Sequence, residues 1–501
     1  MNNRFHRREF VKRGLSAGIA TAAVLSLPAC MSLRSGVAYR ELDAVDMARM
    51  VRDGDITAKE LVSLSRDIIE QLNPQLNAVY TTFYDHAFDL ATNVDRNKPF
   101  AGVPYLIKDL SEYKGFRTTF GSRATLNHIS KRTSPYVNAA VDAGFIPLGK
   151  TSTPENGSLP TTEPLALGPT RNPWNLAYSS GGSSGGSAVA VATGMVPVAL
   201  STDGGGSIRI PAANCGVFGL KASRGRSKGA QTGPLAFSVR GAISRSVRDS
   251  AAHLFYTQQS GDDAVLPPVA LADGPAARRL NIGLVVNGVG NVAPSDEVRE
   301  AILDTSELCR QLGHTVVETR FPDSVIAQAN SMIEARAKEL LKRADRMSRV
   351  LGRPVDEREF EPWTLQQMAL GRRLSDQQES DAIAHIKQQA RDTNAMFNQY
   401  DVLLMPVLGT RPVKLGYIQS TSDISFDEML RRNKRYVCYT TVFNVSGDPA
   451  MSVPLHWTTD GLPIGSQFAA GIGQEEILLG LAYELEAARP WRDRHPPVSI
   501  W

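Results

Sequence analysis

The chain has 501 residues, with 55 Lys or Arg against 51 Asp or Glu, a formal net charge of +4. Residues 1–29 carry that whole excess, so the remainder is neutral and lacks the electrostatic footprint of a nucleic-acid-binding protein. The four cysteines are scattered, and no CxxC or HExxH pattern occurs. We therefore expect no nucleic-acid partner, no disulfide framework, no metal site and no cofactor.

Residues 1–30 have the pattern of an export signal. Arg7-Arg8 begins a twin-arginine match in a basic stretch, and the apolar run over 14–29 is too short for a stable membrane span. The run ends at Cys30, in a sequence that resembles a lipoprotein processing site. We predict a bacterial periplasmic or envelope protein, attached to the membrane if Cys30 is lipidated. The alternatives are simple cleavage nearby and an uncleaved anchor.

No linker-like boundary interrupts residues 31–501, which indicates a single domain. Thr57 and Glu60 form a capping box that opens a helix. Periodicity predicts helices over 43–52, 61–72, 295–312 and 474–485, strands over 102–109, 145–150, 280–286, 314–318 and 400–406, and a last hairpin over 446–455 and 462–470. Lys150 is expected at the exposed end of its strand. The helical, charge-rich stretch 324–399 is expected to cover the site and influence substrate choice.

The most informative stretch is 179–221, which contains two glycine clusters. Gly181–Gly186 reads GGSSGG and Gly204–Ser207 reads GGGS, and an apolar run of small residues lies between them. Such glycine density costs folding entropy and is kept where backbone must approach something closely. Each cluster places hydroxyls beside bare backbone N–H groups. This combination predicts a serine nucleophile with an oxyanion hole.

Other interpretations of the clusters fit less well. Flexible linkers would not lie between core segments, and a phosphate-binding loop would require a closing Lys-Ser or Lys-Thr. A GxSxG nucleophile elbow does match over 181–185, but residues 175–180 before it are not a hydrophobic strand. A Ser183-centred esterase with a histidine base stays open as an alternative, with His456 or His495 as its candidate base.

Lys108 offers a different base. It follows Leu106 and Ile107 near the end of the apolar stretch 102–109. A solvated charge at the strand end is the simpler interpretation. Burial would instead disfavour the ammonium and lower the lysine pKa until the amine can accept a proton.

The chain resembles the amidase signature family of serine hydrolases. The resemblance rests on GVPYLIKD (102–109), GKTSTPENG (149–157), GPTRNPWNLAYSSGGSSGGSA (168–188), TDGGGSIRIPAANCGVFGLK (202–221), YDVLLMP (400–406) and DGLPIGSQF (460–468). Within the family, the chain is similar to the bacterial 6-aminohexanoate cyclic-dimer hydrolase-like amidases. The resemblance implies a single large α/β domain over 31–501, with a mixed central β-sheet surrounded by helices.

The resemblance also implies roles for individual residues. Ser207 is the expected nucleophile, Ser183 the bridging residue after a cis Gly182–Ser183 peptide bond, and Lys108 the base. The oxyanion-hole donors implied by the resemblance are the backbone N–H groups of Gly204, Gly205, Gly206 and Ser207. The substrate would be a small-molecule amide, cleaved through a serine acyl-enzyme to an acid and an amine or ammonia.

Ser184, Asp203 and Arg209 are expected to support the site. Asp203 and Arg209 lie on either side of the expected nucleophile, at a spacing that lets them pair and hold the loop over 204–207 in shape. The alternative role for Asp203 is that of a general base. Ser152, Ser180 and Ala222-Ser223 depart from the family pattern beside the triad positions. A non-catalytic envelope lipoprotein on an amidase scaffold is a further alternative. A subunit of a tRNA amidotransferase fits the export signal and the neutral charge poorly.

Overall fold

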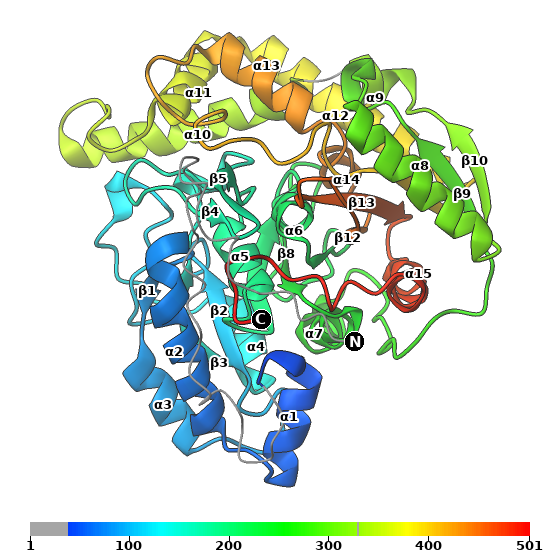
Figure 1. Cartoon of the computed structure of the whole chain (residues 1–501). Helices are drawn as coiled ribbons and strands as arrows, with labels where there is room; N and C mark the ends of the chain where they lie inside the picture. Colours follow the sequence, from blue (N-terminus) through cyan, green and yellow to red (C-terminus); the bar gives the residue numbers. More distant parts are fainter. Residues whose placement is uncertain (1–38, 328–329) are drawn as a thin grey trace, which may run out of the picture.

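The computed structural model describes residues 39–327 and 330–501 (Figure 1). The predicted export signal, including Cys30, lies outside these residues. Among the helices of the described part, none combines the length and apolar character needed to cross a membrane. The three described cysteines, Cys215, Cys309 and Cys438, are buried free thiols.

A mixed sheet of eleven strands organises the described chain, in the order β1-β3-β2-β6-β8-β7-β12-β13-β11-β9-β10. The strands are β1 Val79–Thr82, β2 Pro104–Lys108, β3 Ile146–Thr151, β6 Val198–Asp203, β7 Phe218–Lys221, β8 Val239–Ser244, β9 Asn281–Val285, β10 Thr315–Thr319, β11 Val402–Pro406, β12 Ala450–Trp457 and β13 Pro463–Ala470. Strands β2, β3 and β6 are parallel, as are β9, β10 and β11. Antiparallel pairs join these two groups through β8, β7, β12 and β13.

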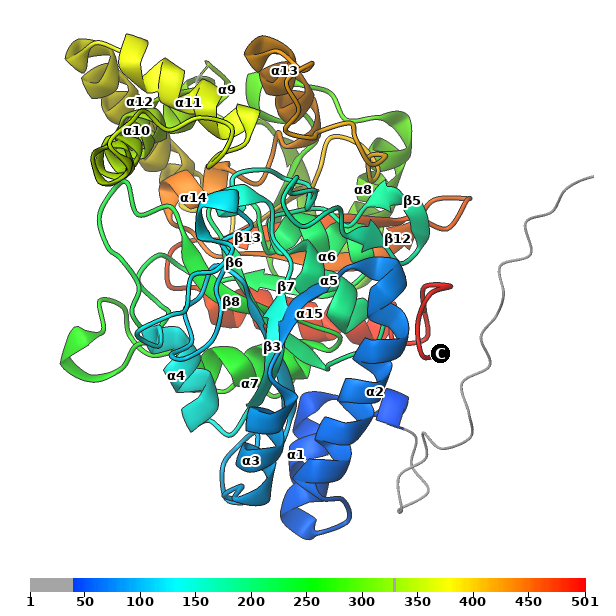
Figure 2. The same cartoon turned by 90° about the vertical axis from the view of Figure 1, so that its left-hand side faces the viewer.

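Helices surround this sheet. They are α1 Ala44–Asp53, α2 Ala58–Leu76, α3 Tyr84–Thr92, α4 Pro135–Asp142, α5 Gly185–Ala192, α6 Arg209–Cys215, α7 Val247–Thr257, α8 Asp296–Gln311, α9 Asp323–Ala327, α10 Ser331–Leu351, α11 Pro362–Arg373, α12 Asp376–Met396, α13 Phe426–Tyr436, α14 Val442–Ser446 and α15 Glu475–Ala488. Helices α10 to α13 gather at one end of the molecule, opposite α1 to α3 (Figures 1 and 2). A small hairpin, β4 Arg171–Asn172 with β5 Asn175–Ser179, stands apart from the main sheet.

Apolar packing on the two halves of the sheet holds the fold together. One buried cluster joins α1, α2 and α5 to strands β2, β3 and β6. A second joins α7, α8 and α15 to strands β7, β12, β13, β11 and β9. The predicted α/β class, with a mixed central sheet inside a shell of helices, is confirmed.

Local signals account for many element ends. The Thr57 side chain accepts from the Glu60 N–H, and the Glu60 side chain accepts from the Thr57 N–H, which is the predicted capping box. Each predicted helix and strand is present, with ends shifted by a few residues. The polar residues 175–180 form only β5 of the small hairpin, so GGSSGG does not follow a strand of the main sheet.

The expectation for Lys150 was wrong. Its side chain is fully buried, and its Nζ donates to the Ser111 carbonyl and to Thr118 Oγ1, the latter at 3.0 Å. Burial lowers its pKa to about 8. The chain returning from β2 covers this end of β3, and such a contact between distant segments leaves no trace in the strand's own sequence.

Candidate active site

Lys108, the last residue of β2, lies at the centre of the candidate site. Its side chain is fully buried. Its Nζ is 2.8 Å from Ser183 Oγ, 2.9 Å from Thr202 Oγ1 and 3.5 Å from the Thr202 carbonyl oxygen. Burial lowers the pKa of Lys108 well below its usual value, and the Asp203 charge opposes that shift only in part. A lysine in this environment can hold its amine neutral.

Ser183 lies just before α5, in the GGSSGG turn. The Gly182–Ser183 peptide bond is cis, and the Ser183 side chain is 1% exposed. The turn packs tightly because a Cβ added at Gly186 would lie 2.3 Å from the Ala78 carbonyl oxygen. Ser184, the next residue, is fully buried, and its Oγ donates to the Thr202 carbonyl at 3.3 Å. The turn is therefore attached to β6 directly beside the lysine.

Ser207 occupies the loop between β6 and α6. It is partly exposed, as are Gly204 and Gly205, whereas Lys108 and Ser183 are buried. Within residues 39–327 and 330–501, the Ser207 hydroxyl has no hydrogen-bond partner. The structure thus joins Lys108 to Ser183 by a hydrogen bond and leaves the Ser207 hydroxyl available on the solvent side.

The backbone of this loop provides fewer free donors than predicted. The Gly206 N–H donates to Asp203 Oδ1 at 2.7 Å, so it is already used. The N–H groups of Gly204, Gly205 and Ser207 have no acceptor in the described part of the chain. A Cβ at Gly206 would lie 2.3 Å from Thr440 Oγ1, and the residue has a φ of 129°, so only glycine fits without strain. Three of the four predicted oxyanion donors remain unpaired.

Asp203 and Arg209 form a fully buried ion pair across the base of the loop. Arg209 Nη2 is 2.9 Å from Asp203 Oδ1, and its Nε is 2.9 Å from Oδ2. Asp203 also accepts from the Ile208 N–H at 3.1 Å. The remaining donors of Arg209 reach Asn444 Oδ1, Gln467 Oε1 and the Thr440 carbonyl at 2.7–2.8 Å. The pair therefore attaches the loop to the carboxyl-terminal part of the sheet.

The charge state of Asp203 follows from this pairing. Burial by itself would raise its pKa, but Arg209 outweighs burial and holds the pKa below its ordinary value. The carboxylate is committed to Arg209 and to backbone N–H groups. These contacts fit a structural role and leave it poorly suited to act as a general base.

Sequence reasoning did not single out Thr202 or Asn444. Thr202 Oγ1 accepts from Lys108, and its position directly before Asp203 in the glycine motif was the available signal. Asn444 Nδ2 donates to the Asp203 carbonyl oxygen at 3.0 Å, to Asp203 Oδ1 at 2.8 Å and to the Phe237 carbonyl at 3.1 Å. No local pattern marks Asn444, because its partners are more than 200 residues away.

The histidine alternative receives no support. His456 Nδ1 lies 3.9 Å from Asp304 Oδ2, and the His495 ring stacks on the Trp501 ring. Over the described ranges, no histidine forms a hydrogen bond with Ser183 or Ser207. His6 lies outside those ranges.

Two of the departures from the family pattern take part in hydrogen bonds beside the site. Ser152 Oγ bonds to Thr170 Oγ1, and Ser180 Oγ donates to the Thr170 carbonyl at 3.1 Å. Both serines are fully buried. Ser180 ties the start of the GGSSGG turn to Thr170, and Ser152 ties the end of β3 to the same residue. Neither serine forms a hydrogen bond with Lys108.

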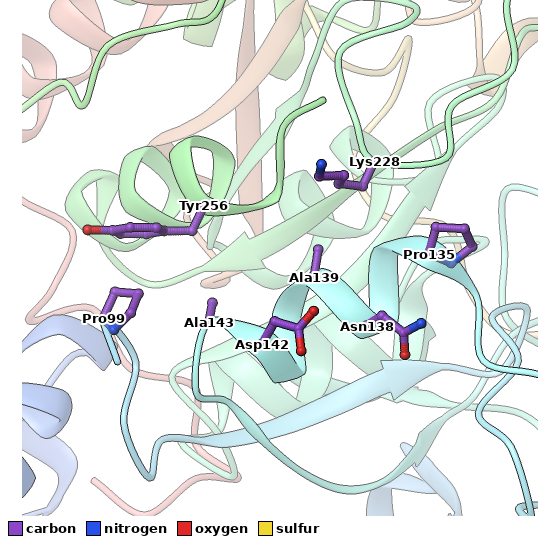
Figure 3. Close-up of a pocket in the computed structure, with 8 residues that line it drawn as sticks. All are labelled: Pro99, Pro135, Asn138, Ala139, Asp142, Ala143, Lys228 and Tyr256. Atoms are coloured by element: carbon purple, nitrogen blue, oxygen red, sulfur yellow. The ribbon is translucent and has the colours of Figure 1, made fainter. Parts of the chain in front are cut away.

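A surface hollow of about 400 Å³ lies elsewhere, between α4 and the end of α7 (Figure 3). Its lining is mainly apolar, with Asp142 and Lys228 as its charged residues. None of the candidate catalytic residues lines it. The hollow is therefore separate from the site at Lys108.

A family model, curated relatives and solved structures all match most of this chain. The family model described as Amidase matches residues 60–479. Putative amidase AmiC of Mycobacterium tuberculosis is 35% identical over 468 residues, covering 92% of this chain and 97% of its own. The 6-aminohexanoate-cyclic-dimer hydrolase of Paenarthrobacter ureafaciens is 34% identical over 499 residues, covering 91% of this chain and 96% of its own. A solved structure of 6-aminohexanoate cyclic dimer hydrolase superposes with a TM-score of 0.85 at 30% identity, covering 92% of this chain and 99% of that one.

Proposed function

The chain belongs to the amidase family and acts on the C–N bond of amides, and from this premise we propose that it works through a Ser207–Ser183–Lys108 relay. The observation that carries the proposal is the 2.8 Å contact between the buried Lys108 amine and the Ser183 hydroxyl. A neutral amine held against a hydroxyl can accept its proton. The oxygen of Ser183 is then able to take the proton of a second hydroxyl.

The first step of the reaction forms a tetrahedral intermediate on Ser207. Ser207 Oγ attacks the amide carbonyl carbon as its proton passes to Ser183 and the Ser183 proton passes to Lys108. The carbonyl oxygen becomes an oxyanion, which the unpaired N–H groups of Gly204, Gly205 and Ser207 are suited to bind. Losing one such donor costs about 3 kcal/mol of transition-state stabilisation in a serine hydrolase.

The following steps form the acyl-enzyme and release the amine and the carboxylic acid. The Lys108 ammonium returns its proton through Ser183 to the leaving nitrogen, and the C–N bond breaks to give an amine or ammonia. Water then attacks the acyl-enzyme ester, with the same relay accepting its proton. The carboxylic acid leaves, and Ser207 regains its hydrogen. An amine is a poor leaving group, so this returned proton is essential to amide cleavage.

The test uses single substitutions and a covalent probe. Ser207→Ala removes the proposed nucleophile, so we expect loss of both amide hydrolysis and labelling by a fluorophosphonate. Lys108→Ala keeps the nucleophile but removes the base, so kcat should fall by roughly 10²–10⁴-fold. Hydrolysis of short aliphatic amides, measured by ammonia release, reports both effects.

Ser201→Ala is the matched control. Ser201 is a buried serine on β6 whose hydroxyl donates to the Ala199 carbonyl at 3.4 Å and, among the described residues, has no other hydrogen-bond partner. It should retain wild-type activity and labelling. Full activity in Ser207→Ala or Lys108→Ala would exclude the relay, and labelling of Ser183 in place of Ser207 would favour a Ser183-centred hydrolase.

We propose that the substrate is a small-molecule amide, linear or cyclic. The similarity to 6-aminohexanoate-cyclic-dimer hydrolases supports including cyclic and linear aminohexanoate oligomers among the amides screened. We also propose that the enzyme is exported by a twin-arginine signal and carried to the bacterial envelope, where a lipid on Cys30 attaches it to the membrane. The basic Arg7-Arg8 pattern supports export, and subcellular fractionation tests it.

A further inference from the structure

Arg336 lies beside the nucleophile loop and has no ion-pair partner among residues 39–327 and 330–501. It lies on α10, and a Cβ added at Gly204 would be 3.3 Å from its Nη2. Met332, one turn earlier on the same helix face, lies 3.7 Å from where a Cβ of Gly205 would be. The first turns of α10 therefore cover the two partly exposed glycines whose N–H groups are free.

The surroundings of Arg336 contain no carboxylate partner. Its side chain is exposed, and no described residue forms a hydrogen bond or ion pair with it. Its guanidinium carbon lies 5.8 Å from the centre of the buried Phe237 ring, a cation–π contact that fixes its direction. The Asp203 carboxylate below the loop is occupied by Arg209.

Other basic residues of α10 are partnered differently. Arg343 reaches Glu339 at 3.5 Å, and Lys338 reaches Asp376 at 2.8 Å. Those pairs use side chains of α10 itself and of the neighbouring α12. Arg336 lies on the face turned toward the loop, where a protein carboxylate would obstruct the substrate.

We propose that Arg336 binds a carboxylate of the substrate, so that the preferred substrates are amides carrying an anionic group close to the scissile bond. The guanidinium presents a planar fork of donors that matches a carboxylate bidentately. Its closeness to Gly204 limits the carboxylate to a few bonds from the reacting carbonyl. This inference rests on the proposed function, because it takes the loop at Gly204 as the place where the carbonyl binds.

The experiment compares matched pairs of substrates. On the acyl side, N-succinyl-4-nitroaniline is compared with neutral N-butyryl-4-nitroaniline. On the amine side, N-butyryl-β-alanine is compared with N-butyrylpropylamine. The wild type should prefer the carboxylate in one of the two arms, and the arm that responds identifies the side of the scissile bond on which the anion lies.

Arg336→Met should lower kcat/KM for the preferred carboxylated substrate by roughly 10- to 100-fold, the usual range for a lost charge-assisted hydrogen bond. Hydrolysis of its neutral partner should stay within about twofold. Arg336→Lys retains the charge without the fork, so its loss should be intermediate. Arg349→Met, an exposed arginine in the last turn of α10, is the matched control and should alter neither substrate.

Two results would overturn the inference. One is a wild type without preference for the carboxylate in either arm, and the other is an Arg336→Met variant that loses both members of a pair equally. In either case neutral amides still report on the relay, because Ser207→Ala removes their hydrolysis independently. Failure of the carboxylate site is thus distinguishable from failure of the proposed function.

Discussion

The surroundings of Lys108 determine the protonation state of its amine. An exposed lysine is charged at neutral pH and cannot accept a proton. Here the flanking strands exclude water, while Ser183 Oγ and Thr202 Oγ1 orient the amine without offering it a full negative charge. Desolvation therefore outweighs the attraction of Asp203, and the neutral form becomes accessible.

This environment predicts the pH dependence of the enzyme. Because the pKa of Lys108 is lowered, the active neutral amine is present above that pKa, and protonation removes it as the pH falls. We expect kcat/KM to decrease about tenfold per pH unit on the acid side, with a midpoint well below the ordinary lysine value of 10.5.

Lys108→Arg tests the same point, since a guanidinium stays charged at every accessible pH. Initial rates measured over the pH range in which both proteins stay folded should show no recovery of this variant at high pH. A Lys108→Arg enzyme with wild-type activity would contradict a lysine base.

At the scale of elements, the loop between β6 and α6 owes its shape to one buried ion pair. Asp203 ends the strand, Arg209 begins the helix, and between them the chain turns back through three glycines and Ser207. The Asp203 carboxylate accepts from Gly206 and Ile208, so it acts as an internal template for the turn. The N–H groups of Gly204, Gly205 and Ser207 keep no acceptor among the described residues, and they are the donors proposed for the oxyanion.

Removing this charge should cost stability as well as activity. Asp203→Asn leaves the Arg209 guanidinium buried and unneutralised, which typically costs about 3–5 kcal/mol. We expect a lower midpoint of thermal unfolding together with reduced kcat. In the wild type, the pKa of Asp203 lies below its ordinary value of 3.8, so the pair stabilises fully above that value and loses its contribution only as the pH falls further.

Arg278→Gln is the matched control for Asp203→Asn. Arg278 pairs with Asp401 at the surface, where its side chain is 62% exposed. An exposed pair contributes about 0–1 kcal/mol, so its thermal midpoint should change little. Equal shifts in both variants would mean that the buried pair does not hold the loop.

At the scale of the whole molecule, the site depends on a sheet that joins distant parts of the chain. Lys108 comes from β2 on one half of the sheet, while Gln467 comes from β13 on the other. Asn444 on α14 bonds both Asp203 and Arg209, and Gln467 bonds Arg209 as well. The carboxyl-terminal segment thus supports a site whose proposed reacting groups all precede residue 210.

The proposed export concerns the chain as a whole. Twin-arginine transport carries folded proteins, so by this route the assembled sheet would cross the membrane intact. Replacing Arg7-Arg8 with two lysines should leave active enzyme in the cytoplasmic fraction, whereas the wild type should be found with the envelope. Cys30→Ala should abolish incorporation of labelled palmitate if that cysteine is lipidated.

Replacement of Lys12 by Gln is the control for the export test, since it removes a basic residue but keeps the arginine pair. It should leave localisation unchanged. Wild-type enzyme found only in the cytoplasm would contradict export, and export of the two-lysine variant would exclude the twin-arginine route.

The sequence alone determined the fold class, the family and the residues proposed for the relay, because these depend on short patterns. The apolar stretch ending at Lys108, the GGSSGG turn and the GGGS loop each carry their signal within a few neighbouring residues. Only the tertiary structure decided that Lys150 is buried, that Gly206 donates to Asp203 rather than to a ligand, and that Arg336 lies beside Gly204 with no carboxylate partner in the described part of the chain. Those facts arise from packing between segments far apart in the chain. The burial and the charge state of each side chain depend on neighbours that cannot be predicted from the residues next to it in sequence.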